Sequence, residues 1–273
     1  MSDTLSEAPP PHLTEDEVLR LIEIVEDLDP VIVGGQALNL WVQYYRAEEP
    51  GFLGDRPYTS KDLDFYRNQE AAERLADALA GKVLIPGPDD MGPSAALVVG
   101  KLGGRKLEID FMSTILGVES RQITNNQVLI DAPSPETQRP IRLLLLHPLD
   151  CFRSRLANTN TLCRHDEHSV SQARAAQEVL QRFLHDLLDQ EGRFRHVQTI
   201  LRDLSYVIRD SHAGEATHLR HALTPEKVLH AFRDDPRLDV RWREKILAPS
   251  IERVTRWLST AEERQARSAA RAE

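Results

Sequence analysis

The hydrophobic pattern of the first half of the chain predicts helices and strands in alternation. Between Thr14 and Leu28 apolar residues recur at helical spacing, and Thr14 and Glu17 have the spacing of a capping box. The apolar run Val31-Ile32-Val33 is typical of a short buried strand. The same criteria predict further helices over 36–46 and 68–80, and further strands over 61–66, 83–85, 95–100, 106–111, 127–131 and 141–146.

The pattern changes after Pro148, where apolar residues recur three and four positions apart over longer stretches. These stretches predict helices over 150–158, 169–189, 194–210, 225–232 and 240–260. We therefore expect an α+β protein in which a mixed β-sheet with flanking helices is followed by a helical domain. The expected organisation is a flexible tail over 1–12, an α/β domain over 13–147 and a helical domain over 148–273.

The composition agrees with an ordinary soluble globular protein, because 41% of the 273 residues are hydrophobic and 28% are charged. No apolar stretch is long enough to span a bilayer, and the N-terminus lacks the basic start and apolar run of a signal peptide. Two cysteines provide no disulfide framework. We therefore expect a cytoplasmic protein with no membrane partner.

Charge is distributed unevenly between the two halves of the chain. Residues 1–140 contain 24 acidic and 12 basic residues, whereas residues 141–273 contain 19 and 22. An acidic half suits metal binding and a basic half suits a polyanionic partner, although many of the arginines could simply cover solvated helices.

Gly34 and Gly35 lie between the predicted strand 31–33 and the predicted helix 36–46. Without side chains, their backbone N–H groups can approach a phosphate closely, and the start of a helix favours a bound anion. A tight turn is the simpler explanation for two glycines at a strand end. The pair therefore indicates a phosphate site only in combination with other residues.

Asp62 and Asp64 lie two residues apart in the predicted strand 61–66, so their side chains point to the same face. Adjacent carboxylates repel each other unless a cation lies between them, and Mg²⁺ prefers oxygen ligands together with substrate phosphates. The alternative is an exposed strand face with two solvated charges, which the neighbouring Lys61 would suit.

A third carboxylate, Asp110, is flanked by Ile109 and Phe111 in the predicted strand 106–111. A carboxylate in apolar surroundings needs a partner or a metal ion. Glu108 shares the strand face of Asp110, and we expect it to be exposed or to lie outside the set of metal ligands.

In their order and context these motifs resemble the nucleotidyltransferase superfamily related to DNA polymerase β. The resemblance lies in a hydrophobic-Gly-Gly turn that opens a helix, an Asp-x-Asp strand and a third Asp strand, and the motifs lie within residues 31–180. More narrowly, Val33-Gly34-Gly35-Gln36-Ala37-Leu38 with Ser60-Lys61-Asp62-Leu63-Asp64 resembles the AbiEii-type branch, which includes toxins of toxin–antitoxin and phage-defence systems. Gln36 stands where Ser or Thr is common in that superfamily.

The resemblance implies a site and a reaction. Asp62, Asp64 and Asp110 would be the catalytic residues and would hold Mg²⁺, or Mn²⁺ in its place, with an NTP as substrate. A basic residue after Pro148 would steady phosphate charge, and Arg155 is a better match for it than Arg153. The implied nucleotide-binding residues are Gly34, Gly35, Gln36, Ser60, Lys61 and Arg155.

The sequence does not identify the molecule that accepts the nucleotide. RNA such as tRNA, with a toxin-like activity and a cognate antitoxin as partner, is the leading expectation by analogy with the branch. The alternatives are an antitoxin-like enzyme that nucleotidylates a partner protein, a small-molecule acceptor, and a non-catalytic regulatory module that binds nucleotide. Three intact carboxylates favour catalysis over binding alone.

Cys163, His165 and His168, with Cys151 upstream, form a second candidate group. Their spacing does not match a zinc-finger pattern, so ordinary polar residues at a helix junction are the better interpretation.

Arg195, Arg202 and Arg209 recur every seven residues and therefore share one face of the predicted helix 194–210. This face could contact the backbone of RNA, or it could pair with nearby acids as a solvated surface.

Overall fold

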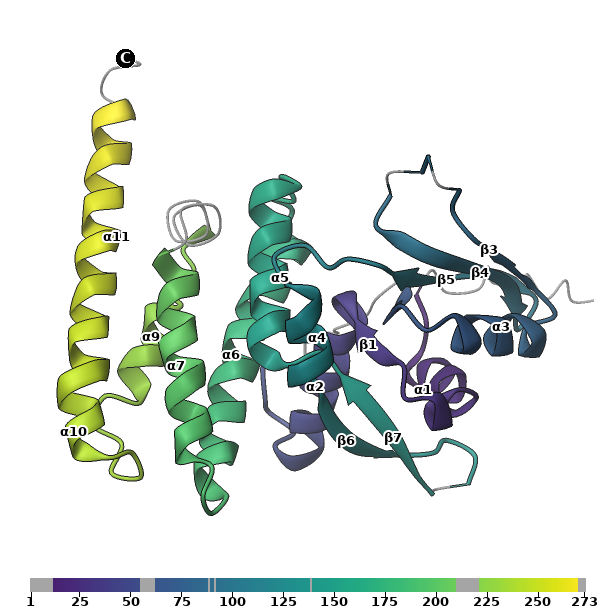
Figure 1. Ribbon diagram of the computed structural model, residues 1–273, viewed down its shortest axis with the longest axis horizontal. Helices are drawn as coiled ribbons and strands as arrows, with labels where there is room; N and C mark the ends of the chain where they lie inside the picture. The colour runs from purple at the N-terminus through teal and green to yellow at the C-terminus, as the bar shows by residue number, and fades with distance from the viewer. Residues whose placement is uncertain are drawn as a thin grey trace, which may run out of the picture. The chain divides into compact units, whose positions relative to one another are not determined.

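The computed structural model describes residues 12–54, 62–87, 89–90, 92–137, 139–209 and 221–269 (Figure 1). The candidate nucleotide-binding residues Ser60 and Lys61, and the expected tail except for its last residue, lie outside the described residues. The chain divides into two compact units, with the boundary between His147 and Pro148, and each unit is described by itself below.

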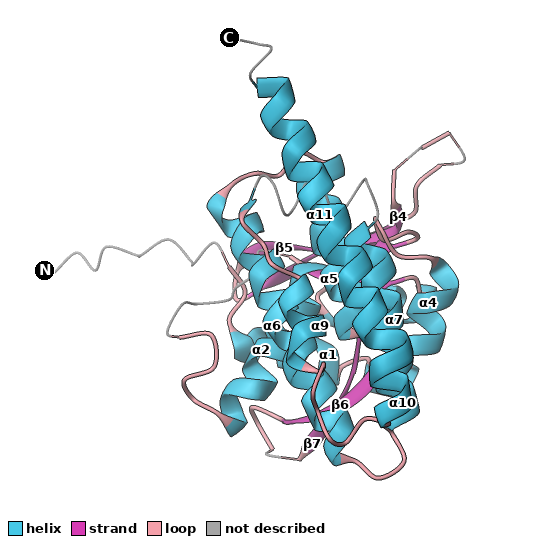
Figure 2. Cartoon of the chain, turned by 90° about the vertical axis from the view of Figure 1, so that its left-hand side faces the viewer, coloured by secondary structure: helices cyan, strands magenta, loops and turns pink. Residues whose placement is uncertain are grey.

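The fold is α+β, as predicted: a mixed sheet with flanking helices forms the first unit, and the described part of the second unit consists of helices and loops. Figure 2 distinguishes the strands in magenta from the helices in cyan. The elements of the first unit are α1 (Glu15–Glu23), η1 (Glu26–Leu28), β1 (Val31–Val33), α2 (Gly34–Glu48), β2 (Leu63–Tyr66), α3 (Gln69–Ala78), β3 (Lys82–Leu84), β4 (Ser94–Leu102), β5 (Arg105–Met112), α4 (Ser120–Asn126), β6 (Val128–Pro133) and β7 (Pro140–Leu145).

The strands form one sheet in the order β3-β4-β5-β2-β1-β7-β6. The central strand β2 is parallel to β5 and antiparallel to β1, and β1 is parallel to β7. The hairpin between β4 and β5 turns at Gly103 and Gly104, whose φ angles of 57° and 84° suit glycine. This turn joins the two strands that the sequence predicts over 95–100 and 106–111.

One face of the sheet carries the hydrophobic core of the first unit. Ile32, Phe65 and Phe111 are fully buried side chains of three different strands on this face, and the rings of Phe65 and Phe111 stack with centroids 5.2 Å apart. Helix α3 lies against β3 and β4 (Figure 1). Because alternate residues of a strand point to opposite faces, Asp64 and Asp110 lie on the other face of the sheet.

Helix α1 is shorter than the helix predicted over 14–28. Its start agrees with the sequence, since Thr14 and Glu17 form the predicted capping box. The regular helix ends at Glu23 because the backbone at the buried residue Val25 leaves the helical region, with φ −123° and ψ 5°. The short 3₁₀ turn that follows ends at Asp29, which has φ 48°.

The described elements of the second unit are helical. They are α5 (Pro148–Thr161), α6 (Glu167–Asp189), α7 (Phe194–Arg209), α9 (Glu226–Ala231), α10 (Val240–Trp242), the π-helical turn η2 (Arg243–Leu247) and α11 (Ala248–Ala269). The helix predicted over 240–260 therefore extends to Ala269 and contains a π-turn, which the hydrophobic period does not reveal. Within the described ranges, no helix combines the length and the apolarity that crossing a membrane requires.

Candidate functional site

Asp64 in β2 and Asp110 in β5 are direct neighbours in the sheet. Their Cα atoms are register partners in the parallel pair of strands, so the two carboxylates lie on one face, on strands separated by about 4.8 Å. Both residues are half-buried, while Leu63 and Ile109, which precede them, are fully buried on the opposite face. Two carboxylates in this arrangement repel each other, and a bound cation would relieve the repulsion.

Gly34 joins β1 to α2 at a point where the carboxylate of Asp64 touches the backbone. Its φ is 67°, which is strained for any residue with a side chain. A methyl group on Gly34 would overlap with Oδ2 of Asp64 and would lie 3.0 Å from its Cγ. The preceding residue, Val33, is the register partner of Asp64 in the antiparallel pair β1–β2. The start of the 15-residue helix α2 and the carboxylate of Asp64 are therefore held side by side.

Asp62, the first residue of the Asp-x-Asp motif, is exposed and precedes β2. The described side chains include no group of three His, Cys, Asp or Glu residues that could hold a metal ion, so Asp62 is not gathered with the pair Asp64–Asp110. Mg²⁺ is commonly held by one or two carboxylates and completes its shell with water and substrate phosphates. The chemistry of the pair Asp64–Asp110 therefore fits Mg²⁺ together with a phosphorylated substrate.

Ser94 is a member of this site that the sequence analysis missed. Its Oγ donates a hydrogen bond of 2.5 Å to Oδ1 of Asp110. A β-bulge between Ser94 and Ala96 places Ser94, rather than Ala95, opposite Met112, and Met112 shares its strand face with Asp110. A bulge has no clear signal in the sequence, which is why Ser94 could not be placed beside Asp110 in advance.

Replacing Ser94 with Ala should weaken the binding of Mg²⁺ to the pair Asp64–Asp110 without abolishing it. The hydroxyl orients the Asp110 carboxylate, and the loss of such a supporting hydrogen bond typically costs 10–100-fold in metal affinity. We expect the dissociation constant for Mg²⁺, measured by calorimetry, to rise about tenfold. Ser94→Thr should retain the hydroxyl and most of the Mg²⁺ response.

Ser113→Ala is the matched control for Ser94→Ala. The Ser113 hydroxyl donates to the carbonyl of Pro93 at 2.7 Å, so this variant removes a serine hydrogen bond near the same strand end but not one to Asp110. An equal shift of the Mg²⁺ requirement in both variants would show that Ser94 acts only on local stability.

Gln36 and Glu108 lie close in sequence to site residues but make other contacts. Gln36 is 3% exposed, and its Oε1 accepts a hydrogen bond of 3.4 Å from Nδ2 of Asn39 within α2. Glu108 is exposed and pairs with Lys106 at 2.5 Å. The expectation that Glu108 is an exposed residue is confirmed.

The basic residues of the candidate nucleotide site lie in the second unit, in α5. Nη1 of Arg155 donates to Oε1 of Gln172 in α6 at 2.8 Å. Nη1 of Arg153 forms an ion pair of 3.0 Å with the buried carboxylate of Asp150. Each arginine therefore has a partner within its own unit, and a role for Arg155 at phosphate stays a prediction.

The residues weighed for zinc form no metal-binding group of three among the described side chains. Cys151 is buried in α5, and burial raises the pKa of its thiol to about 12, so the thiol stays protonated. Cys163 and His165 lie in the exposed connection between α5 and α6.

Asp166 caps α6, and hydrogen bonds from the hydroxyl and the backbone N–H of Ser169 lower the pKa of its carboxyl.

Comparisons with known proteins add little to this geometry. No family model matches the chain, and a search of curated proteins found no match. Among solved structures, the chain is similar to the crystal structure of JHP933 from Helicobacter pylori, with 14% sequence identity and a TM-score of 0.35 over 96% of this chain and 100% of that one. A TM-score this low supports no conclusion about fold or function, so the functional argument depends on the site itself.

Proposed function

We propose that the protein is a Mg²⁺-dependent nucleotidyltransferase that transfers NMP from an NTP to RNA such as tRNA. The observation that carries the proposal is the register of Asp64 and Asp110, with Gly34 packed against the Asp64 carboxylate. A pair of carboxylates beside a helix N-terminus provides a place for a divalent cation and for the phosphates of a nucleotide. The resemblance to the DNA polymerase β-related superfamily supports the same reaction.

In this proposal Asp64 and Asp110 would hold the cation. When bound, Mg²⁺ supplies positive charge that polarises the phosphate and makes the attacking hydroxyl more acidic. Gly34 lets the Asp64 carboxylate pack against the start of α2, where the phosphates would bind, and Asp110, oriented by Ser94, accepts the proton of the acceptor hydroxyl. The acceptor oxygen then bonds to the α-phosphorus as the bond to pyrophosphate breaks, which leaves a nucleotidylated acceptor.

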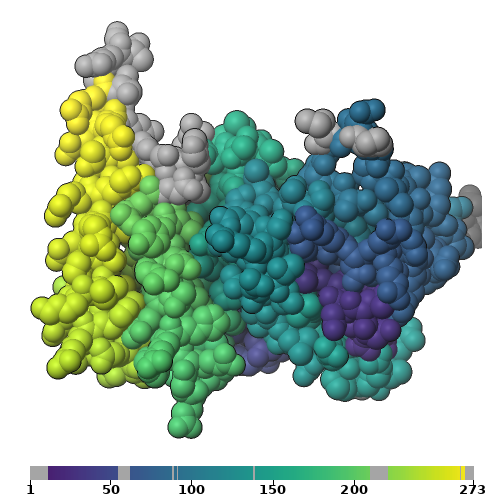
Figure 3. All heavy atoms as spheres, in the orientation of Figure 1, coloured from purple at the N-terminus to yellow at the C-terminus, as the bar shows by residue number. Residues whose placement is uncertain are grey.

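The exposed side of α7 supports RNA as the acceptor. Arg195, Arg202, Tyr206 and Arg209, spaced at helical intervals, share this side, which we call the α7 face. Tyr206 is 59% exposed, and the guanidinium of Arg209 lies 5.0 Å from the centroid of its ring. Figure 3 shows green atoms of this part of the chain on the surface that faces the viewer.

Exposed arginines alternating with an exposed aromatic ring suit single-stranded nucleic acid. Arginine neutralises phosphate charge, and an aromatic ring offers a base a stacking surface worth about 1–3 kcal/mol. The ion pair between Arg202 and Asp203, at 3.6 Å, leaves the side chain of Arg202 55% exposed. The α7 face therefore combines the two features that RNA-binding surfaces use.

The resemblance to the AbiEii-type branch adds two further elements to the proposal. The transfer would be toxic to the cell that makes the protein, and a cognate antitoxin would be a partner of the chain. The toxicity is tested by comparing the growth of cells that express the wild-type chain and an inactive variant.

The decisive experiment incubates the full chain with each α-labelled NTP, Mg²⁺, and either total tRNA or a cell lysate. The proposal requires label to enter RNA and to need Mg²⁺. Label on a protein band instead would identify a protein-nucleotidylating enzyme and overturn the choice of acceptor. Binding of NTP without transfer to any acceptor would identify a nucleotide-binding module and overturn the catalytic proposal.

Neutralising the α7 face should weaken RNA binding and its dependence on salt. Each phosphate contact to a single strand contributes a slope of about −0.7 to the plot of log affinity against log salt. Replacing Arg195, Arg202 and Arg209 together with Gln should therefore make the slope shallower by about 2, and the RNA affinity at physiological salt should fall at least tenfold. Fluorescence anisotropy with labelled single-stranded RNA measures both quantities.

The control for this variant changes the charge by the same amount elsewhere in the unit. Replacing the exposed arginines Arg241, Arg256 and Arg264 with Gln alters α10 and α11 but leaves the α7 face intact. The assignment of the α7 face fails if both triple variants lose RNA affinity equally, or if neither does.

A further inference from the structure

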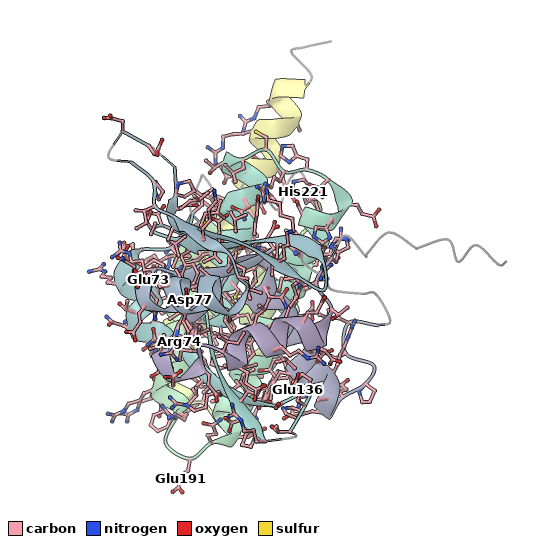
Figure 4. The ribbon with its side chains drawn as sticks, turned by 90° about the vertical axis from the view of Figure 1, so that its right-hand side faces the viewer. Glu73, Arg74, Asp77, Glu136, Glu191 and His221 are labelled. Atoms are coloured by element: carbon pink, nitrogen blue, oxygen red, sulfur yellow. The ribbon has the colours of Figure 1, made fainter. Side chains whose placement is uncertain are left out.

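Two histidines that are 56 residues apart in sequence meet in the second unit. Nδ1 of His165 lies 3.2 Å from Nε2 of His221, and the ring centroids are 5.2 Å apart at an interplanar angle of 34°. The contact is exposed to solvent. Figure 4 labels His221, which is followed by the short connection to α9.

The backbone on both sides of this contact is anchored. The N–H of His165 donates to the carbonyl of Cys163 at 3.0 Å, and the next residue, Asp166, caps α6. On the other side, Nη2 of Arg174 in α6 donates to the carbonyl of His221 at 3.2 Å. Both rings are therefore attached to positions fixed against the same helix.

The distance between the two nitrogens is the distance that a shared metal ion requires. Zinc lies 2.0–2.1 Å from an imidazole nitrogen, so two such nitrogens on one tetrahedral ion are about 3.3 Å apart. Two nitrogens this close share either a proton or a metal ion, because two protonated rings would repel each other.

We propose that His165 and His221 form a two-histidine site for a transition-metal ion, with Zn²⁺ as the ion of choice. Neutral imidazole is a preferred ligand of Zn²⁺, Cu²⁺ and Ni²⁺, whereas Mg²⁺ prefers oxygen. Among the described residues, no third His, Cys, Asp or Glu forms a metal-binding group with the pair. This site is chemically distinct from the carboxylate pair of the first unit and does not depend on the proposed function.

The ion would act as a cross-link within the second unit. It would connect His165, which precedes the cap of α6 at Asp166, to His221, which precedes the connection to α9. An ion that binds only the folded chain stabilises it by mass action, so the melting temperature should rise with Zn²⁺ concentration.

The test uses the tag-free, full-length chain after bound metals have been removed. The chain is titrated with ZnCl₂ in an excess of Mg²⁺, and calorimetry measures the binding of Zn²⁺. The wild-type chain should bind one Zn²⁺, and its melting temperature should rise. His165→Asn and His221→Asn should each bind Zn²⁺ at least tenfold more weakly and should lose the thermal shift. Both side chains are at the surface, so circular dichroism should confirm that the variants fold.

Two control variants separate this site from other sources of binding. His168→Asn removes an exposed histidine of the same segment, and Asp64→Asn removes a carboxylate of the first unit. Both controls should bind Zn²⁺ as the wild type does. The proposal is overturned if the wild type binds no Zn²⁺, if either pair variant keeps full affinity, or if a control loses as much affinity as the pair variants.

Discussion

Asp64→Asn is expected to reduce Mg²⁺-dependent transfer from a labelled NTP by about 10³-fold. The charge of a metal ligand stabilises the transition state by several kcal/mol, and each 1.36 kcal/mol changes the rate tenfold. Asparagine preserves the shape of the side chain against Gly34, so the loss should come from charge alone. Asp110→Asn should have an effect of the same size. The proposed toxicity requires that cells expressing the wild-type chain stop growing and that cells expressing either variant keep growing.

Measurements of thermal stability distinguish this loss of transfer from misfolding of the variants. The register of Asp64 and Asp110 places like charges side by side, and neutralising one of them relieves repulsion when no cation is bound. Without Mg²⁺, the melting temperature of Asp110→Asn should therefore equal or exceed that of the wild type. The same variant should lose transfer when Mg²⁺ is present.

Glu108→Gln is the control for both aspartate variants. It removes an exposed carboxylate from the same face of β5, two residues from Asp110, and should leave transfer unchanged. Retention of more than a third of the activity in Asp64→Asn, or an equal loss in Glu108→Gln, would refute the assignment of the carboxylate pair.

Gly34→Ala should impair both folding and transfer. The φ of 67° costs an alanine roughly 1–2 kcal/mol, and the added methyl group must displace the Asp64 carboxylate that it overlaps. A displacement of about 1 Å in a reacting group can cost on the order of 10²-fold in rate. We expect a loss of stability of about 1–3 kcal/mol in urea unfolding and a fall of about 10²-fold in transfer at saturating Mg²⁺.

Gly103→Ala is matched to Gly34→Ala in backbone strain. Gly103 has φ 57° in the turn between β4 and β5, and nothing lies within 4 Å of the position of its added methyl group. This control should lose comparable stability through the backbone alone while its transfer rate stays unchanged. If the two glycine variants lose transfer equally, the effect of Gly34 is one of stability and not of the site.

The local elements of the fold could be predicted from the sequence because their signals are local. The strand Val31–Val33 has the predicted bounds, since a short apolar run between Pro30 and Gly34 leaves little choice. The cap at Thr14 was found in the same way, from the spacing of Thr14 and Glu17. Helix α4 (Ser120–Asn126) was missed because only Ile123 of its residues is buried, so its hydrophobic pattern is weak.

The arrangement of the candidate site could be predicted only in part. The sequence indicates which carboxylates belong on strands, but the pairing of β2 with β5 joins segments separated by α3, β3 and β4. Ser94 reaches Asp110 through a bulge, and His221 reaches His165 from another part of the chain. Contacts of this kind depend on tertiary packing, which neither periodicity nor spacing encodes.

The pairing of β2 with β5 also links correct folding to the presence of the site. A slip of one residue in β5 would move Ile109 away from Leu63 and Phe65 and would turn Asp110 into that hydrophobic core, where an unpaired carboxylate is costly. The misaligned sheet would therefore be penalised twice, by lost apolar burial and by a buried charge. The register that buries Ile109 and Phe111 is therefore also the register that places Asp64 beside Asp110.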